Sequence, residues 1–225
     1  MILVMKRTRV KICCISSLEE SHLAISYGAD ALGLVSQMPS GPGIIDEDLI
    51  KSIARVAPPP LGTFLLTSAL SADEIIAQQS RCGVNTIQIV DALPPSEYAQ
   101  LRAAMPGVAL VQVIHVRNEE SIADARAVAG EVSAVLLDSG DPTRVVKELG
   151  GTGRVHSWCL SRAIVEALDI PVFLAGGLCA ENVTEAINTV KPFGVDVCSG
   201  VRTDDKLDGN KLSSFMAAVE PGSLA

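Results

Sequence analysis

Aromatic residues are scarce in this chain of 225 residues: Phe, Tyr and Trp together make up 3% of it, although 48% of the chain is hydrophobic. The apolar content is therefore mostly Ala, Val, Ile and Leu, a composition typical of parallel strands covered by helices. Charged residues are only 20% of the chain. A chain of this length and composition can bury a large core, as one large domain or two small ones.

Basic residues are also in short supply. The chain has 18 Lys and Arg against 26 Asp and Glu, which gives a net charge of −8, and it has no basic run. A nucleic-acid-binding surface needs positive charge to neutralise phosphates, so we expect no nucleic acid partner. A small anionic ligand stays open, because backbone N–H groups bind anions without net basic charge.

Metal-binding, membrane and secretion patterns are missing too. The six cysteines form no C-x-x-C pair and only three histidines are present, so no zinc site is indicated. No apolar run is long enough to span a membrane, and residues 1–9 place their apolar run before their charges, the reverse of a signal peptide. We expect a cytoplasmic protein without a membrane partner, with reduced thiols.

Short apolar, β-branched runs alternate with amphipathic stretches along the chain. The runs, which predict eight strands, are 10–15, 31–35, 61–66, 85–90, 109–116, 133–138, 170–176 and 193–200. The amphipathic stretches, which predict helices, are 18–27, 46–56, 72–82, 96–105, 119–129, 161–168, 180–190 and 209–219. Ser71 followed by Glu74 fits a capping box, and the segment 94–96 suits another helix start.

Eight strand–helix alternations in a chain of this length fit a single (β/α)₈ barrel domain over residues 1–225. A doubly wound open sheet is the competing fold. We favour the barrel because the count closes at eight with no surplus strand. No linker or low-complexity segment suggests a second domain.

In a barrel, catalytic groups lie at the C-terminal ends of the strands. Asp138 ends an apolar run, where a carboxylate is hard to explain as core, so it predicts an acid or base. Cys13 is either a thiolate base or nucleophile, or a small buried hydrophobe. Strand alternation would turn its neighbour Cys14 the other way, toward the helices. His115 either enters the site or caps a strand.

Two late glycine-containing loops predict a phosphate site. Barrels often bind phosphate with the loops after strands 7 and 8 and the N-terminus of a short helix. Gly176 and Gly177 follow the seventh expected strand, and Ser199 and Gly200 follow the eighth. Glycines let backbone N–H groups approach an anion closely, although they also simply make tight turns.

The order of several motifs resembles a known family. The motifs are KIC (11–13), YGADALGLV (27–35), LLDS (136–139), GGTG (150–153), LAGGL with ENV (174–178 and 181–183) and GVDVCSGV (194–201). From Val10 to about Phe215 the chain is similar to phosphoribosylanthranilate isomerase of tryptophan biosynthesis.

The resemblance implies a single-domain barrel that catalyses an Amadori rearrangement of a phosphoribosyl amine without cofactor or metal. By position, Cys13 matches the general base and Asp138 the general acid. The phosphate ligands match Gly176, Gly177, Ser199 and Gly200, and the rest of the substrate is assigned to Lys11, Gln88, Gly151, Thr152 and Gly153. A phosphorylated sugar is the expected partner, and a homodimer is among the expected assemblies.

The chain departs from the family pattern mainly around the aryl carboxylate. Cys14 stands where the family usually has glycine, the segment 40–43 lacks the arginine that helps hold the carboxylate, and no histidine follows Gln88. Arg202 stands where glutamate is common, and Arg117, Arg154 and Arg202 are candidate replacements for the missing arginine.

These departures leave two alternatives open beside the isomerase. One is a paralogue that isomerises another phosphosugar amine or an aldose phosphate. The other is a non-catalytic barrel that binds a phosphorylated ligand. We favour the isomerase because Cys13, Asp138 and the phosphate loops are all retained.

Overall fold

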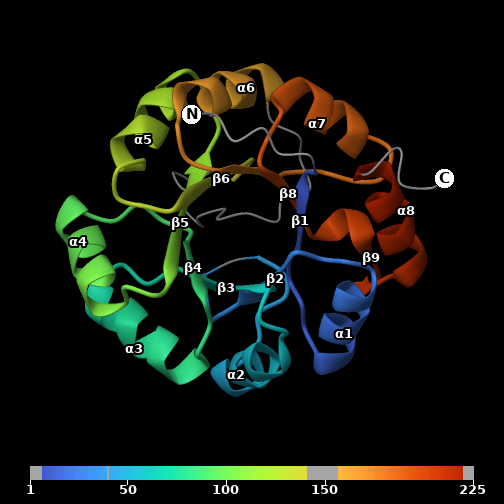
Figure 1. Cartoon of the computed structure of the whole chain (residues 1–225), viewed down its shortest axis with the longest axis horizontal. Coiled ribbons are helices and arrows are strands. Elements are labelled where there is room, and N and C mark those ends of the chain that lie inside the picture. The colour runs from blue at the N-terminus through green and yellow to red at the C-terminus, as the bar shows by residue number, and fades with distance from the viewer. Residues whose placement is uncertain (1–6, 40, 141–156, 220–225) are drawn as a thin grey trace.

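Eight parallel strands close into a barrel, and helices surround it (Figure 1). The computed structural model describes residues 7–39, 41–140 and 157–219. The strands follow one another in chain order, and β1 (Arg9–Ile12) pairs with β8 (Gly194–Val197) to close the ring. The predicted (β/α)₈ barrel is therefore confirmed.

The elements lie close to their predicted positions. The other barrel strands are β2 (Ala31–Val35), β3 (Gly62–Thr67), β4 (Thr86–Ile89), β5 (Ala109–His115), β6 (Ala134–Asp138) and β7 (Val172–Leu174). The helices are α1 (Leu18–Ser26), α2 (Glu47–Val56), α3 (Ala72–Cys82), α4 (Pro95–Ala104), α5 (Glu120–Val128), α6 (Trp158–Ala167), α7 (Val183–Val190) and α8 (Gly209–Val219). Three short elements were not predicted: the 3₁₀ helix η1 (Ser199–Val201) and the hairpin β9 (Arg202–Thr203) and β10 (Lys206–Leu207).

Helix starts follow local capping chemistry. The Ser71 side chain accepts a hydrogen bond from the Glu74 N–H, and α3 begins at the next residue, as the capping pattern predicts. The Ser17 side chain accepts in the same way from the Glu20 N–H at the start of α1. These bonds satisfy N–H groups that have no partner inside the helix.

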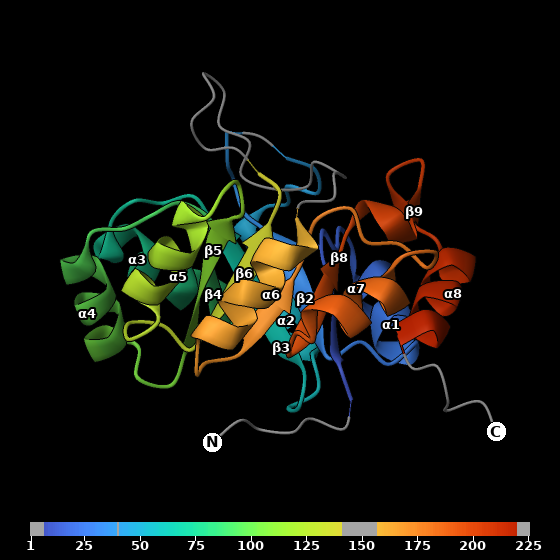
Figure 2. The ribbon, with the colours of Figure 1, turned by 90° about the horizontal axis from the view of Figure 1, so that it is seen from above.

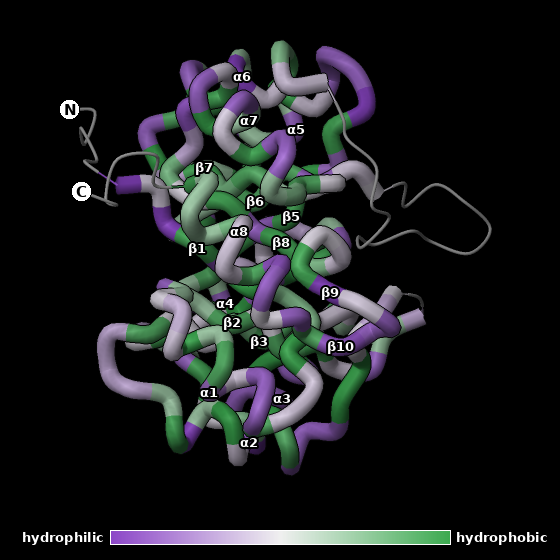
Figure 3. The backbone as a smooth tube through the Cα atoms, turned by 90° about the vertical axis from the view of Figure 1, so that its right-hand side faces the viewer, coloured by the Kyte–Doolittle hydropathy of each residue, from purple (hydrophilic) through white to green (hydrophobic). Residues whose placement is uncertain are grey.

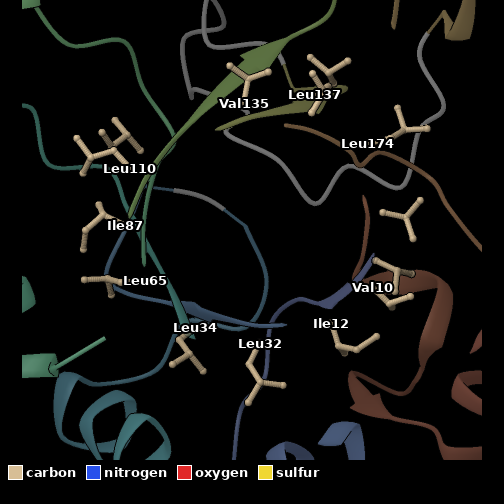
Figure 4. Packing of buried hydrophobic residues seen from close by; sticks show 14 of the residues in the cluster. Val10, Ile12, Leu32, Leu34, Leu65, Ile87, Leu110, Val135, Leu137 and Leu174 are labelled. Atoms are coloured by element: carbon tan, nitrogen blue, oxygen red, sulfur yellow. The ribbon is translucent and has the colours of Figure 1, made fainter. Parts of the chain in front are cut away.

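The outer faces of the strands and the inner faces of the helices share one apolar core. Figure 4 shows its strand side, where the aliphatic side chains form a ring around the barrel and point away from its centre. The labelled residues are Val10, Ile12, Leu32, Leu34, Leu65, Ile87, Leu110, Val135, Leu137 and Leu174. In Figure 3, the hydrophobic segments gather over the strands, and hydrophilic ones lie mostly on the helices and turns.

Three of the phenylalanines lie together at the floor of the barrel. Phe64, Phe173 and Phe193 pack edge to face, with ring centroids 5.8 Å apart for the first pair and 5.3 Å for the second. Gly62 and Gly194, near the starts of β3 and β8, leave space for the Phe64 and Phe173 rings, because a Cβ at either position would lie within 2.9 Å of a ring carbon. The floor is thus sealed by apolar groups.

The loops that follow the strands lie together at the opposite end, the mouth of the barrel (Figure 2). The β9 hairpin is on the same side. Parallel strands bring all their carboxyl ends to one face, so side chains far apart in sequence meet there. Within the described ranges, no helix combines the length and apolar character needed to cross a membrane.

Candidate active site

Cys13 lies at the mouth, directly after β1. Its N–H donates to the Val197 carbonyl over 2.8 Å, which extends the β1–β8 pairing by one residue, and its side chain is buried among the inward-facing residues. Gly33 on β2 faces it. A Cβ at position 33 would lie 2.7 Å from the Cys13 Sγ, so only glycine leaves room for this sulfur.

Lys11 lies one inward position below Cys13 and is fully buried. Its Nζ is 2.9 Å from Oδ1 of Asp196 on β8 and 5.5 Å from the centroid of the Phe64 ring. Burial lowers the pKa of Lys11, but the charge of Asp196 and the neighbouring Cys13 side chain together raise it above its usual value. Lys11 is therefore an ammonium beside the Cys13 sulfur.

Asp138 ends β6 and points into the barrel, on the same face as Leu136. Burial raises the pKa of its carboxyl to about 6, and the charge of Asp196 adds to the rise, whereas the Ser139 N–H and Lys11 oppose it. The Ser139 N–H donates to Oδ1 of Asp138 over 2.7 Å. Burial is thus the main reason why this carboxyl keeps its proton to a higher pH than an exposed aspartate.

Two further polar side chains from neighbouring strands face the mouth. Gln88 on β4 is 3% exposed, and its Oε1 has no hydrogen-bond partner among the described residues. A buried oxygen without a partner is costly, so it suits the binding of a polar ligand group. His115 is the register neighbour of Asp138, and its Nε2 lies 3.1 Å from the Val90 carbonyl oxygen.

The glycine loop after β7 has an unusual backbone. Gly176 and Gly177 have φ angles of 89° and 63°, in the left-handed region that favours glycine. The Asn182 side chain fixes this loop, because its Nδ2 donates to the Gly177 carbonyl and its Oδ1 accepts from the Cys179 N–H, both over 2.9 Å. Asn182 was not among the predicted site residues, although the ENV motif contains it.

The loop after β8 packs against the loop after β7. A Cβ on Gly200 would overlap the Leu178 carbonyl oxygen, so the two backbones approach as only glycine permits. Among the described residues, the N–H groups of Gly176, Gly177, Ser199 and Gly200 donate to no acceptor. Such groups at the start of the 3₁₀ helix and beside it suit an oxyanion.

Arg202 ties this second loop to the turn that carries Cys13. Its Nη1 and Nη2 donate to the two carboxylate oxygens of Glu20, each over 3.0 Å, and Nη2 also donates to the carbonyls of Cys13 and Cys14. The Arg202 guanidinium therefore binds groups of the protein itself and holds the two segments together. The hypothesis that it replaces the missing carboxylate-binding arginine is wrong, because these partners hold its guanidinium.

Cys14 does not face the helices as strand alternation predicts. Its φ is 61°, so the chain turns in the left-handed region directly after β1, and its side chain joins the inward cluster with Cys13. Its Sγ lies 2.7 Å from Sγ of Cys198. The prediction was wrong because β1 ends at Ile12, and side-chain alternation holds only within a strand.

Some predicted residues cannot be placed. Gly151, Thr152, Gly153 and Arg154 lie outside the described residues. Arg117, which follows β5 at the mouth, is exposed, and its role toward a carboxylate stays a prediction.

The fold and the site together define a class of protein. A (β/α)₈ barrel that has titratable side chains at its strand ends, and paired glycine loops after β7 and β8, is typical of enzymes that act on small phosphorylated molecules.

Comparison with known sequences makes the assignment specific. The sequence model of the family described as N-(5′phosphoribosyl)anthranilate (PRA) isomerase matches residues 10–218. Curated isomerases of this name from Methanocella arvoryzae and Haloarcula marismortui are 33% and 37% identical. The two matches cover 94% and 87% of this chain and 98% and 88% of the relatives. The chain belongs to the phosphoribosylanthranilate isomerase family.

Solved structures agree with this. The phosphoribosylanthranilate isomerase of Thermotoga maritima superimposes with a TM-score of 0.80 at 28% identity, over 94% of this chain and 98% of that one. Another isomerase structure, at a TM-score of 0.77 and 26% identity, covers 94% of this chain and 98% of its own. It contains reduced 1-(o-carboxyphenylamino)-1-deoxyribulose 5-phosphate.

Proposed function

We propose that this chain catalyses the Amadori rearrangement of N-(5′-phosphoribosyl)anthranilate to 1-(o-carboxyphenylamino)-1-deoxyribulose 5-phosphate. The observation that carries the proposal is the arrangement at the mouth. Cys13 and Asp138 both point into the barrel there, and the two loops after β7 and β8 have N–H groups that donate to no acceptor in the described part of the chain. The bound compound in the related structure supports the same substrate class.

Asp138 is the proposed general acid. It protonates the furanose ring oxygen, so that the ring opens to a Schiff base between C1 and the anthranilate nitrogen. A carboxyl group must be protonated to do this near neutral pH, and burial holds the pKa of Asp138 at about 6.

Cys13 is the proposed general base. It removes the C2 proton of the Schiff base to give an enolamine, which tautomerises to the ketone. The Lys11 ammonium, held by Asp196, lies beside the Cys13 sulfur and stabilises negative charge on it. Lys11 is fully buried, so we assign its effect to Cys13, and direct contact with substrate stays a prediction.

The substrate phosphate is proposed to bind at Gly176, Gly177, Ser199 and Gly200, whose N–H groups point to no protein acceptor among the described residues. The unpartnered Gln88 oxygen suits a hydroxyl donor of the sugar. The assigned roles of Gly151, Thr152 and Gly153 stay predictions. The dimeric isomerase of Thermotoga maritima makes a homodimer a reasonable assembly to test; a cytoplasmic location also stays a prediction.

The test is turnover of phosphoribosylanthranilate, followed as the loss of its fluorescence. We expect turnover by the unmodified protein and, for Cys13→Ala and Asp138→Asn, a loss in kcat of roughly 10²–10⁴-fold each. Turnover no higher than that of the Cys13→Ala, Asp138→Ala double variant would overturn the proposal.

One observation keeps a second substrate in view. The family pattern has an arginine after the second strand that helps hold the anthranilate carboxylate. Here the segment after β2 has no arginine, and Arg202 is bound to Glu20, so neither of these two positions supplies it. A paralogue acting on another phosphosugar amine would fit. Thermal shift assays with aminoaldose and ketose phosphates test this, and stabilisation by the anthranilate product analogue alone would exclude it.

Any turnover that depends on Asp138 would exclude a non-catalytic barrel.

A further inference from the structure

Three cysteine side chains gather at the mouth, and the proposed reaction uses only Cys13. Cys14 follows it on the turn after β1, and Cys198 is the first residue after β8. These two strands are neighbours, with Ile12 opposite Val197, so the two turns leave the barrel side by side. The Sγ atoms of Cys14 and Cys198 lie 2.7 Å apart.

Cys14 is held in this position by its neighbours. The guanidinium of Arg202 binds the Cys14 carbonyl, and Cys14 packs so closely on Gly43 that a Cβ there would collide with it. A disulfide requires an S–S distance of about 2.05 Å. The fold therefore already holds the two sulfur atoms close to bonding distance.

The surroundings divide the two thiols into different roles. Cys198 is partly exposed, whereas Cys14 is buried. The hydrogen bond with Cys14, and after it the charge of Arg202, lower the pKa of Cys198, although burial opposes the change. Hydrogen bonds with Cys13 and with Cys198 raise the pKa of Cys14. Cys198 is thus the more accessible and the more acidic of the two thiols, which suits attack on an oxidant, and Cys14 is the neighbouring thiol placed to resolve it.

We propose that Cys14 and Cys198 are a modification site: an oxidisable thiol pair that closes to a disulfide across the β1–β8 end of the mouth. With a peroxide as oxidant, the Cys198 sulfur attacks one peroxide oxygen, the O–O bond breaks and hydroxide leaves, which gives a sulfenic acid. The Cys14 sulfur then displaces the oxygen from Cys198. The S–S bond forms, water leaves, and the two electrons have passed to the peroxide.

The disulfide changes the proposed active site in two ways, and this part rests on the proposed function. First, Cys14 lies in the same inward cluster as Cys13, and oxidation replaces its S–H, a donor group beside the proposed base, with a disulfide sulfur that cannot donate. Second, the bond fixes the Cys13 turn to the residue before Ser199 and Gly200. Oxidation should therefore lower turnover by roughly tenfold or more, as expected for a misplaced base.

The experiment compares the reduced full-length protein with the same protein after a brief exposure to hydrogen peroxide. Remaining thiols are blocked with N-ethylmaleimide, and tandem mass spectrometry of the digest locates any disulfide. Turnover is measured before oxidation, after it, and after dithiothreitol. We expect one disulfide, Cys14–Cys198, and a loss of turnover that dithiothreitol reverses.

Variants separate this pair from the other cysteines. Cys198→Ser and Cys14→Gly each remove one partner, and glycine suits the left-handed backbone at position 14. Cys179→Ser and Cys159→Ser are the matched controls. Each variant is compared with its own reduced rate. The pair variants should lose the dithiothreitol-reversible inhibition, and the controls should keep it.

Several results would overturn the inference. The first is that Cys14 and Cys198 stay unlinked after oxidation, and the second is a disulfide that includes Cys13. The third is that peroxide inhibits Cys198→Ser as strongly and as reversibly as it inhibits the unmodified protein. A Cys14–Cys198 disulfide with unchanged turnover would overturn the effect on activity. If the reduced protein has no turnover at all, the proposed function fails, whereas disulfide mapping still decides whether the pair exists.

Discussion

At the scale of single residues, the proposed chemistry depends on which buried ionisable side chain lacks a partner of opposite charge. Lys11 and Asp196 neutralise each other inside the barrel, whereas among the described residues Asp138 is compensated by the N–H and the more distant hydroxyl of Ser139, and burial raises its pKa to about 6. A carboxylic acid that keeps its proton near neutral pH can donate it to a sugar oxygen. The same burial that makes Asp138 an acid should also make it a cost to stability.

The acid role predicts a pH dependence. Asp138 must carry its proton to act, and its pKa is about 6. We expect kcat/KM to fall as pH rises above about 6, approaching a tenfold decrease per pH unit where this step limits the rate. Rates measured from pH 5 to 9 test this, with Asp138→Asn as the variant that should lack the acid limb. A flat profile across this range in the unmodified protein would contradict the assignment.

The burial of Asp138 also predicts a gain in stability on substitution. Its folded pKa of about 6 lies above the unfolded value of 3.8, so its favourable contribution is full below pH 3.8 and is lost as pH rises through 6. Above pH 6 the charged carboxylate costs about 2–3 kcal/mol relative to a neutral isostere. Asp138→Asn should therefore be more stable at pH 8, with the difference shrinking toward pH 4. Urea unfolding of both proteins at several pH values measures this; a difference that grows toward low pH would have the wrong sign.

At the scale of elements, the pair of Glu20 and Arg202 joins three segments of the mouth. Glu20, near the start of α1, accepts from Arg202, from the Ser16 N–H and from the Leu207 N–H. Arg202 lies at the start of β9 and binds the carbonyls of Cys13 and Cys14. This pair, with both side chains mostly buried, holds the turn after β1 against the segment after β8.

We therefore expect Arg202→Met to lower both stability and turnover. The substitution removes the guanidinium that pairs with the mostly buried Glu20 carboxylate, so we expect a loss of about 2–4 kcal/mol in the free energy of unfolding. It also frees the turn that positions Cys13, which should lower turnover. Urea unfolding and kcat measure the two effects, and Arg202→Lys should recover part of kcat. The matched control is Arg162→Met, which breaks a more exposed pair with Glu166 within α6 and should cost less than about 1 kcal/mol. Equal effects of the two substitutions would refute the special role of Arg202.

Periodicity and turn chemistry predicted most elements, but they did not predict the contacts of the mouth. The eight strands and helices follow from apolar patterning, and the start of α3 follows from Ser71. The left-handed backbone of Cys14 and the Arg202–Glu20 pair do not, because they join residues far apart in sequence whose packing no local pattern encodes. The place of Asp138 at the end of β6 was predictable, because a carboxylate that closes an apolar run conflicts with its local pattern, whereas its role as an acid stays a prediction.

At the scale of the whole molecule, the barrel has an apolar floor and a polar mouth. Phe64, Phe173 and Phe193 seal the floor, and the ionisable groups lie above them. The Lys11–Asp196 pair lies where β1 meets β8, the pairing that closes the ring, and these two residues are register partners. A buried ion pair stabilises a fold little compared with apolar residues of the same size, because both charges lose their hydration. Because the pair lies beside Cys13, we expect it to serve the proposed chemistry rather than closure of the barrel.

This difference can be measured by comparing single and double substitutions at the seam. Lys11→Met leaves the Asp196 carboxylate buried without its partner, so we expect a loss of about 3–5 kcal/mol in the free energy of unfolding. The double variant Lys11→Met, Asp196→Leu removes both charges and should recover most of that lost stability. Its turnover should stay at least about tenfold below that of the unmodified protein, because the Cys13 sulfur has lost its ammonium neighbour. Urea unfolding and the fluorescence assay supply the two readouts. If the double variant is as unstable as Lys11→Met, the pair is needed to close the barrel; if it is stable and fully active, the ammonium has no part in the reaction.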